Sequence, residues 1–201
     1  MKKLKNQNGR SMIEMLGVLA IIGVLSVGGI AGYSKAMMKY RINKTIEQIT
    51  LIAGNVRTFF ANQGNYEGLG GLASSCQGDI CTTMRNVMIK AKLVPDDMWN
   101  SDKTDLENAF GGNMDIQYIS KYASSSDNKA FIIDLYNIPE EACIELATYD
   151  WTVAGAQLIS WEYADTGRTK VPLDLETAIK QCAESHDWFG LLFDVDTDSW
   201  L

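Results

Sequence analysis

Four cysteines are the residues of this sequence with the most evident chemistry, since they can form disulfide bonds, bind a metal or remain reduced in a core. They are Cys76, Cys81, Cys143 and Cys182. Only the first two are close in sequence, and the one histidine, His186, follows Cys182 by four residues, which offers a poor ligand set for zinc. An apolar export segment precedes all four. We therefore expect two disulfide bonds in an oxidising compartment, with three connectivities open.

Two other groups of residues suggest chemistry and are weighed against simpler roles. Asp194, Asp196 and Asp198 alternate near the end of the chain and could bind calcium, but no EF-hand glycine follows them. We expect instead the solvent face of a final strand and a frayed tail, and no metal or cofactor. No serine or cysteine nucleophile stands near His186 in a recognisable motif. The sequence therefore predicts a protein that is not an enzyme.

A single acid, Glu14, stands at the start of a long apolar run. Residues 15–34 contain no charged residue and no proline, and at 1.5 Å per residue they span about 30 Å, which is one bilayer core. A carboxylate inside such a span costs about 2.5–3.5 kcal/mol if it lies centrally and less near the interface, so it normally has a partner. The run predicts a membrane-spanning helix, with Glu14 as a residue that needs a counter-charge.

The helical pattern continues beyond the apolar run. From Lys35 onwards the chain is amphipathic, and apolar residues recur at alternating spacings of four and three. They are Ile42, Ile46, Ile49, Ala53, Val56 and Phe60. We expect one helix over residues 11–62, about 75 Å long, that ends near Gly64. A compact domain of this size cannot bury such a rod alone, so its first half must lie in lipid or against other subunits.

The remainder of the chain shows a mixture of short helices and strands after a Gly/Ser-rich loop over residues 64–76. The predicted helices are 82–91, 138–148 and 175–183, and the predicted strands are 114–119, 130–135 and 188–195. The expected fold class is α+β: a long N-terminal helix, hydrophobic in its first half and amphipathic in its second, packed against an antiparallel β-sheet.

Charge limits the partners of this chain. The formal net charge is −7, and loss of the leader residues 1–9 with their three lysines would leave −10. Phosphate backbones need a basic footprint, so nucleic acid is excluded as the main partner.

The residues Gly9-Arg10-Ser11-Met12-Ile13-Glu14, followed by the apolar run, resemble the signature of type IV prepilins and related pseudopilins. That signature is a short basic leader ending in glycine, and then a hydrophobic helix with glutamate at its fifth mature position. The resemblance implies a leader over residues 1–9, a helix over 10–62 whose part 11–34 is the membrane or filament-core half, and a globular head over 63–201. Two features depart from the family: the first mature residue is Arg10 rather than the frequent phenylalanine or methionine, and the hydrophobic half of the helix has no proline.

The resemblance implies roles for individual residues. Gly9 and Arg10 would flank the bond that a prepilin peptidase cuts, and Arg10 would then be N-methylated. The new α-amine lies four residues from Glu14, so that Glu14 of one subunit could meet the amine of its neighbour and fix the axial register of a filament. Cys143 and Cys182 match the cysteines that bound the C-terminal region of such heads. We accordingly expect the pairings 76–81 and 143–182.

The resemblance also implies partners and a location. It indicates a pilin of the type IVb kind, in a Gram-negative bacterium, that polymerises with itself into an adhesive or otherwise functional fibre. Its partners would be the prepilin peptidase, an assembly ATPase with its platform protein, and a secretin. The precursor would sit in the inner membrane with its head in the periplasm, and the product would be an extracellular filament.

Several alternatives remain open at this point. A plain signal anchor would retain the leader, and a secretory signal peptide would be cut after the apolar run, near Ala31. Within the resembling families, a type II secretion pseudopilin and a minor pilin or tip adhesin share the same N-terminal pattern.

Overall fold

The computed structural model describes residues 12–69, 79–122, 126–161, 167–184 and 188–201, with the side chains of 79–84, 184 and 200 excepted. The chain divides into two compact units, Met1–Tyr40 and Arg41–Leu201. We call them the N-terminal unit and the C-terminal unit and describe each by itself.

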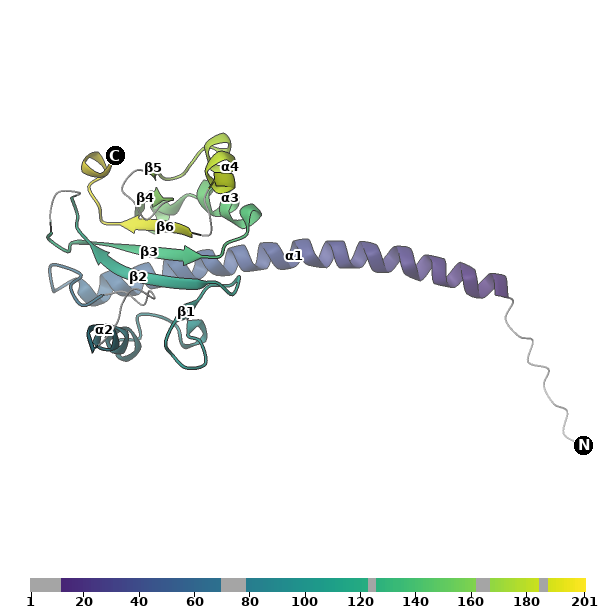
Figure 1. Cartoon of the computed structure of the whole chain (residues 1–201), viewed down its shortest axis with the longest axis horizontal. Helices are drawn as coiled ribbons and strands as arrows, with labels where there is room; N and C mark the ends of the chain where they lie inside the picture. The colour runs from purple at the N-terminus through teal and green to yellow at the C-terminus, as the bar shows by residue number, and fades with distance from the viewer. Residues whose placement is uncertain (1–11, 70–78, 123–125, 162–166, 185–187) are drawn as a thin grey trace, which may run out of the picture. The chain divides into compact units, whose positions relative to one another are not determined.

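The long helix predicted from the apolar pattern is present as α1, Met12–Phe60 (Figure 1). Its first residues, 12–40, belong to the N-terminal unit, and its last twenty form part of the C-terminal unit. No proline interrupts these 49 residues, so no hydrogen bond of the helical ladder is lost to a missing N–H. The expected bounds, 11–62, exceed the helix by two residues at the C-terminal end, where Gln63 N–H donates to the carbonyl of Phe60 in a closing turn.

The amphipathic part of α1 buries one face in the C-terminal unit, as its period indicates. Of the six residues of the predicted stripe, five are buried, and Ile46 is half-buried. The buried face also includes residues that the apolar pattern did not single out, and these are Thr45, Gln48 and Ile52. Thr45 satisfies its hydroxyl within the helix by donating to the carbonyl of Arg41 at 2.9 Å, which lets a polar side chain enter the core.

Among the described residues, six strands form one sheet in which every neighbouring pair is antiparallel. The strands are β1 Leu106–Glu107, β2 Asn113–Ile119, β3 Ala130–Tyr136, β4 Ala156–Ser160, β5 Arg168–Lys170 and β6 Trp188–Phe193. Their order across the sheet is β1-β2-β3-β6-β4-β5. The strand that comes last along the chain, β6, therefore lies between β3 and β4.

The centre of the sheet is buried on both faces. Six consecutive residues of β3, from Ala130 to Leu135, are buried, and alternate residues point to opposite faces. Phe131 faces α1 and stacks on Phe193 of β6 with ring centroids 4.7 Å apart. On the other face, Ile132 packs with Leu158 and Leu192 in a second apolar cluster. The predicted α+β fold with a helix packed on an antiparallel sheet is confirmed.

Short helices complete the C-terminal unit: α2 Asp79–Lys90, η1 Asp96–Met98, α3 Glu140–Thr148, η2 Trp151–Val153, α4 Leu175–Glu184 and α5 Thr197–Trp200. The three predicted short helices correspond to α2, α3 and α4, and the three predicted strands to β2, β3 and β6. The sequence did not predict β1, β4 or β5. The end of the chain also differs from the expected frayed tail, because β6 ends at Phe193 and Asp196 caps α5 by accepting from the N–H of Ser199 at 3.2 Å.

Candidate functional site

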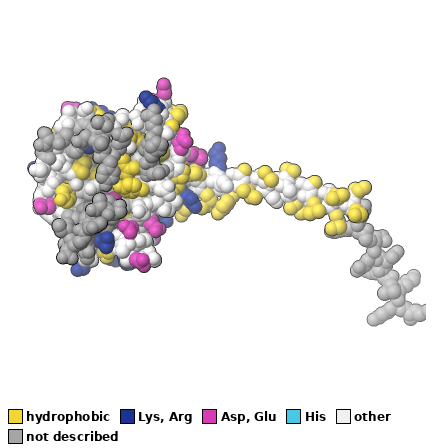
Figure 2. All heavy atoms as spheres, viewed as in Figure 1, with side chains coloured by type: hydrophobic (Ala, Val, Ile, Leu, Met, Phe, Trp, Pro, Cys, Tyr) yellow, Lys and Arg dark blue, Asp and Glu magenta, His cyan; other side chains and the backbone are white. Residues whose placement is uncertain are grey.

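The N-terminal unit presents an apolar helix surface. Residues 12–36 of α1 are all exposed, and the exposed fractions include 84% for Met12, 70% for Val27 and 67% for Ile30. Figure 2 shows hydrophobic side chains along this stretch. By length and composition α1 is the one helix in the described part of the chain that could cross a membrane. An apolar surface of this size is characteristic of a segment that contacts lipid or another protein chain.

Glu14 lies in the first turn of α1 and is exposed. A carboxylate there interacts favourably with the unpaired N–H groups of the helix N-terminus. Gly9 and Arg10, the residues at the predicted cleavage site, lie outside the described residues. The structure therefore places Glu14 at the start of the apolar surface.

In the C-terminal unit, the side chain of Arg57 joins α1 to two other segments of the chain. Its Nη2 donates to Asp194 Oδ1 at 2.8 Å and to the Gly155 carbonyl at 2.8 Å, and its Nη1 donates to the Ala154 carbonyl at 2.7 Å. The guanidinium also lies 5.5 Å from the ring centroid of Phe193, within the range of a cation–π contact. One side chain thus connects the helix, the η2–β4 turn and the residue that follows β6.

The same cluster fixes the backbone around it. Asp194 has a φ of 60° and also accepts a hydrogen bond from the hydroxyl of Tyr66. Burial raises the pKa of the Tyr66 hydroxyl above its ordinary value, and the hydrogen bond to Asp194 acts in the same direction, so the phenol stays a donor. Gly155 has a φ of 84°, and a Cβ at this position would lie 2.1 Å from Arg57 Nη1. A side chain at position 155 would therefore displace the guanidinium from its present place.

The three alternating aspartates near the end of the chain have protein partners. Asp194 binds Arg57, Asp196 caps α5, and Asp198 lies 3.9 Å from Lys170. Among the described residues no group of three or more histidines, cysteines or acids could hold a metal ion. Each of the three aspartates thus has a partner within the protein, and Asp194 is the counter-ion of Arg57 on α1.

The disulfide bond predicted between Cys143 and Cys182 is present and joins α3 to α4. The two cysteines are 39 residues apart in sequence, and both are buried. Trp151 is linked to the same helix, since it is fully buried and its Nε1 donates to the Leu146 carbonyl of α3 at 2.6 Å. Cys76 and His186 lie outside the described residues, and Cys81 falls in the part of α2 whose side chains are not described.

Two carboxylates lie side by side in the sheet, which sequence reasoning missed. Asp115 of β2 and Asp134 of β3 are direct cross-strand partners, and both are buried. Gln117 Nε2 donates to Asp134 Oδ2 at 2.9 Å. Burial raises the pKa of Asp134 to about 7, the hydrogen bond from Gln117 lowers it, and the charge of Asp115 raises it further. The sequence did contain one signal of this buried acid, since Asp134 is a charged residue inside the apolar run Ala130–Tyr136.

The chain is similar to known proteins in sequence and in structure. Residues 39–189 match the sequence model of the PilS N-terminal family. Among solved structures, the chain resembles the type IVb pilin from Salmonella typhi with 13% identity and a TM-score of 0.52, over 77% of this chain and 99% of that one. It also resembles TcpA, a type IV pilin from the Vibrio cholerae El Tor biotype, with 17% identity and a TM-score of 0.49, over 77% of this chain and 98% of that one.

No match is found among curated proteins. The family match spans well over half of the chain, and the Salmonella typhi structure shares its fold. The chain therefore belongs to the PilS N-terminal family and has the fold of a type IV pilin.

Proposed function

We propose that this protein is the structural subunit of a type IV pilus, made as an inner-membrane precursor and assembled into a filament through the N-terminal part of α1. The observation that carries the proposal is the exposed apolar surface of residues 12–36, which begins at an acid in the first helical turn. Lipid covers that surface before assembly, and the same helices of other subunits cover it afterwards. The role is structural, and no catalytic step is assigned to the chain.

Glu14 is the residue that sets the register of the filament in this proposal. A prepilin peptidase cuts between Gly9 and Arg10, and methylates the new amino group of Arg10. In a staggered bundle the cationic amine of one subunit neutralises Glu14 of its neighbour. Any other stagger leaves an unpaired charge in an apolar environment, which costs several kcal/mol by the general behaviour of buried charges. The guanidinium of Arg10 adds a second cation at the same place.

The partners follow from this route of assembly. The precursor spans the inner membrane of a Gram-negative bacterium with its C-terminal side in the periplasm, where Cys143 and Cys182 can be oxidised. An assembly ATPase and its platform protein extract the subunit, and the growing filament leaves the cell through a secretin. The finished pilus is extracellular.

The test is the N-terminal sequence of protein recovered from sheared surface filaments, read by mass spectrometry. The expected sequence begins at a methylated Arg10. A chain that begins at residue 33 or beyond, as after removal of a signal peptide, would refute the proposal. Electron microscopy of the same cells separates a pilus from a type II secretion pseudopilin, which forms no long surface fibre, and the abundance of the chain in the filaments separates a major from a minor subunit.

Substitution of Glu14 tests its role. Glu14→Ala should leave membrane insertion intact and abolish filaments, whereas Glu140→Ala, which removes an exposed acid from the first turn of α3, should leave filaments unchanged. Normal filaments from the Glu14→Ala protein would overturn the role given to this residue.

A further inference from the structure

A group of exposed aromatic and basic residues follows the apolar run of α1. They are Tyr33, Lys35, Lys39 and Tyr40, all in the N-terminal unit, and we call them the collar. Tyr33 is 67% exposed and Tyr40 is 60% exposed. In Figure 2, basic side chains lie on the helix where its run of hydrophobic side chains ends. Tyrosine and lysine suit the boundary between lipid and water, because each combines an apolar part with a polar end.

The distance of the collar from Glu14 matches the thickness of a bilayer. Both lie on one continuous helix, and at 1.5 Å per residue the stretch from Glu14 to Tyr33 is about 29 Å long, close to the thickness of one hydrocarbon core. Lys35 and Lys39 are separated by about 6 Å along the same axis, which is about the depth of the headgroup layer on one side of a bilayer. With Glu14 at one boundary of the hydrocarbon core, the two lysines lie among the headgroups at the other.

The collar residues are distributed around the helix and do not form one stripe. At 3.6 residues per turn, Tyr33 and Tyr40 lie on one face, and Lys35 and Lys39 lie on a different face. Residues 12–36, which include the first half of the collar, are exposed on every side of the helix. A neighbouring helix contacts a single stripe, whereas lipid contacts a helix all round. The distribution therefore favours lipid as the partner of the collar in a single precursor.

Charge indicates the kind of lipid. Residues 15–46 contain no acid, so Lys35 and Lys39 belong to a stretch of α1 with a net positive charge. Cations usually gather on the cytoplasmic side of a membrane span, but in the proposed topology these two lie on the opposite side. A lysine at that level is attracted to the phosphate groups of anionic phospholipids.

We propose that the collar binds anionic phospholipid in the leaflet on the C-terminal side of the span. Lys35 and Lys39 lie against lipid phosphates, and the rings of Tyr33 and Tyr40 lie at the level where the acyl chains meet the headgroups. The inference rests on the proposed function, in which the precursor sits in a membrane. It adds a class of lipid that holds α1 at one depth until the subunit is assembled.

The test is native mass spectrometry of the full-length precursor in detergent, mixed with phosphatidylglycerol or with phosphatidylcholine of the same acyl chains. The unaltered chain should bind phosphatidylglycerol more tightly. Lys35→Gln/Lys39→Gln should weaken that binding by about 25-fold, since each cation near an anionic surface contributes a factor of about five, and should leave phosphatidylcholine binding unchanged. Glutamine has nearly the helix propensity of lysine, so the variant keeps α1. Lys35→Arg/Lys39→Arg, which retains both charges, should bind as the unaltered chain does.

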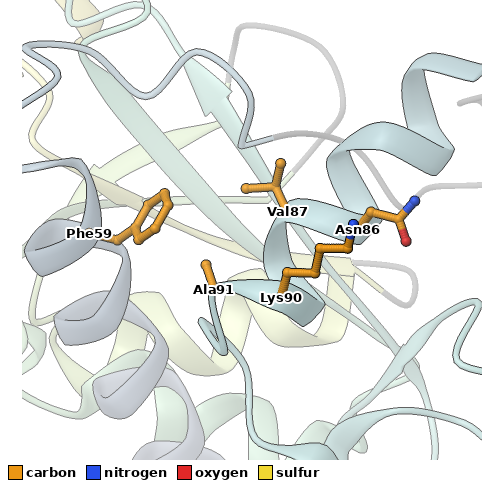
Figure 3. A pocket seen from close by; sticks show the side chains of 5 residues that line it. All are labelled: Phe59, Asn86, Val87, Lys90 and Ala91. Atoms are coloured by element: carbon orange, nitrogen blue, oxygen red, sulfur yellow. The ribbon is translucent and has the colours of Figure 1, made fainter.

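Other cations of the chain require a matched control. The leader carries three lysines at the other end of the span, so the affinities are compared between variants of the same precursor. Lys90→Gln/Lys180→Gln removes two exposed cations from the C-terminal unit, and Figure 3 shows the first of them on α2. This variant should bind phosphatidylglycerol as tightly as the unaltered chain. Equal losses from the collar variant and this control would overturn the inference, as would an unaltered precursor that shows no preference for phosphatidylglycerol.

Filaments separate a failure of this inference from a failure of the proposed function. If Lys35→Gln/Lys39→Gln abolishes surface filaments but leaves phosphatidylglycerol binding unchanged, the collar contacts a neighbouring subunit, which overturns the lipid site and leaves the pilus function intact. If the unaltered chain forms no filaments, or filaments whose subunits begin at residue 33 or beyond, the proposed function itself fails, whichever lipid the precursor binds.

Discussion

Arg57 of α1 and Asp194, the residue directly after β6, form an ion pair at 2.8 Å although they are 137 positions apart in the sequence. Both side chains are about one-third exposed, so solvent screens the pair only in part. The remaining donors of Arg57 bind two backbone carbonyls of the turn before β4. Removing this one side chain would release three segments at once.

Arg57→Met is therefore expected to destabilise the protein by about 2–3 kcal/mol, because Asp194 and two carbonyls lose their donor. The measurement is the denaturant midpoint of the detergent-solubilised chain. The matched control is Lys44→Met, which removes a cation that lies 3.6 Å from the exposed Asp97 and should change stability by less than about 1 kcal/mol. Equal shifts for the two variants would contradict the role given to Arg57.

Gly155→Ala should produce a loss similar to that of Arg57→Met, because the added Cβ would occupy the place of the guanidinium. Gly111→Ala provides the comparison. Gly111 has nearly the same φ, 82° against 84° for Gly155, but a Cβ there would meet nothing within 4 Å. Gly111→Ala should therefore cost only the backbone strain of about 1 kcal/mol. Thermal unfolding of both variants measures the difference, and similar melting temperatures would show that the contact with Arg57 does not matter.

Asp134 should make the stability of the C-terminal unit depend on pH in the direction opposite to most carboxylates. Its pKa is raised from 3.8 to about 7 in the folded protein, so the folded state holds a proton that the unfolded state releases. The stability from this group is complete below about pH 4, falls as the pH rises toward 7, and is absent above it.

The variant Asp134→Asn, which stays neutral, isolates this effect. At pH 8 it should be more stable than the unaltered chain, and the difference between the two should shrink by roughly 1.4 kcal/mol for each pH unit from 7 down to 5. Asp174→Asn is the control, because the pKa of Asp174 is lowered and this acid does not titrate between pH 5 and 8. A difference between Asp134→Asn and the unaltered chain that stays constant over this range would contradict the titration of Asp134.

Loss of the Cys143–Cys182 bond should cost about 4 kcal/mol, from the entropy that a loop of 39 residues regains in the unfolded chain. The double variant Cys143→Ala/Cys182→Ala measures it by chemical denaturation. Peptide mapping without reduction tests the other expected pair. A peptide that links Cys76 to Cys143 or Cys182, instead of Cys76 to Cys81, would show the predicted connectivity to be wrong.

Periodicity predicted the elements that carry strong local signals. The 49 residues of α1 combine an uninterrupted apolar run with a regular stripe, and β3 is almost entirely apolar, so both were expected nearly at their observed bounds. In contrast, β5 has three residues, Arg168–Lys170, with no apolar side chain. This strand forms because its backbone pairs with the edge of β4. That pairing is a tertiary effect, so the local sequence does not predict it.

The candidate sites also differ in whether the local sequence indicates them or only the folded structure does. Glu14 stands out because a lone acid in an apolar run is conspicuous, and the pairing of Cys143 with Cys182 followed from resemblance. Arg57 carries no such local signal, since its partner Asp194 becomes a neighbour only after the sheet has formed. The pairing of Asp115 with Asp134 depends on strand register, which the sequence alone does not specify.

The position of β6 also constrains the order in which the protein can be made. This strand begins at residue 188 and lies between β3 and β4, so until it is delivered the sheet exists only as two separate pieces, β1-β2-β3 and β4-β5. During synthesis the growing chain therefore cannot complete this core until β6 has been made, and Arg57 cannot pair with Asp194 before residue 194 has been added. A nascent chain of this kind has exposed strand edges until residue 188 and those after it are available, and completion of the sheet requires the insertion of one central strand.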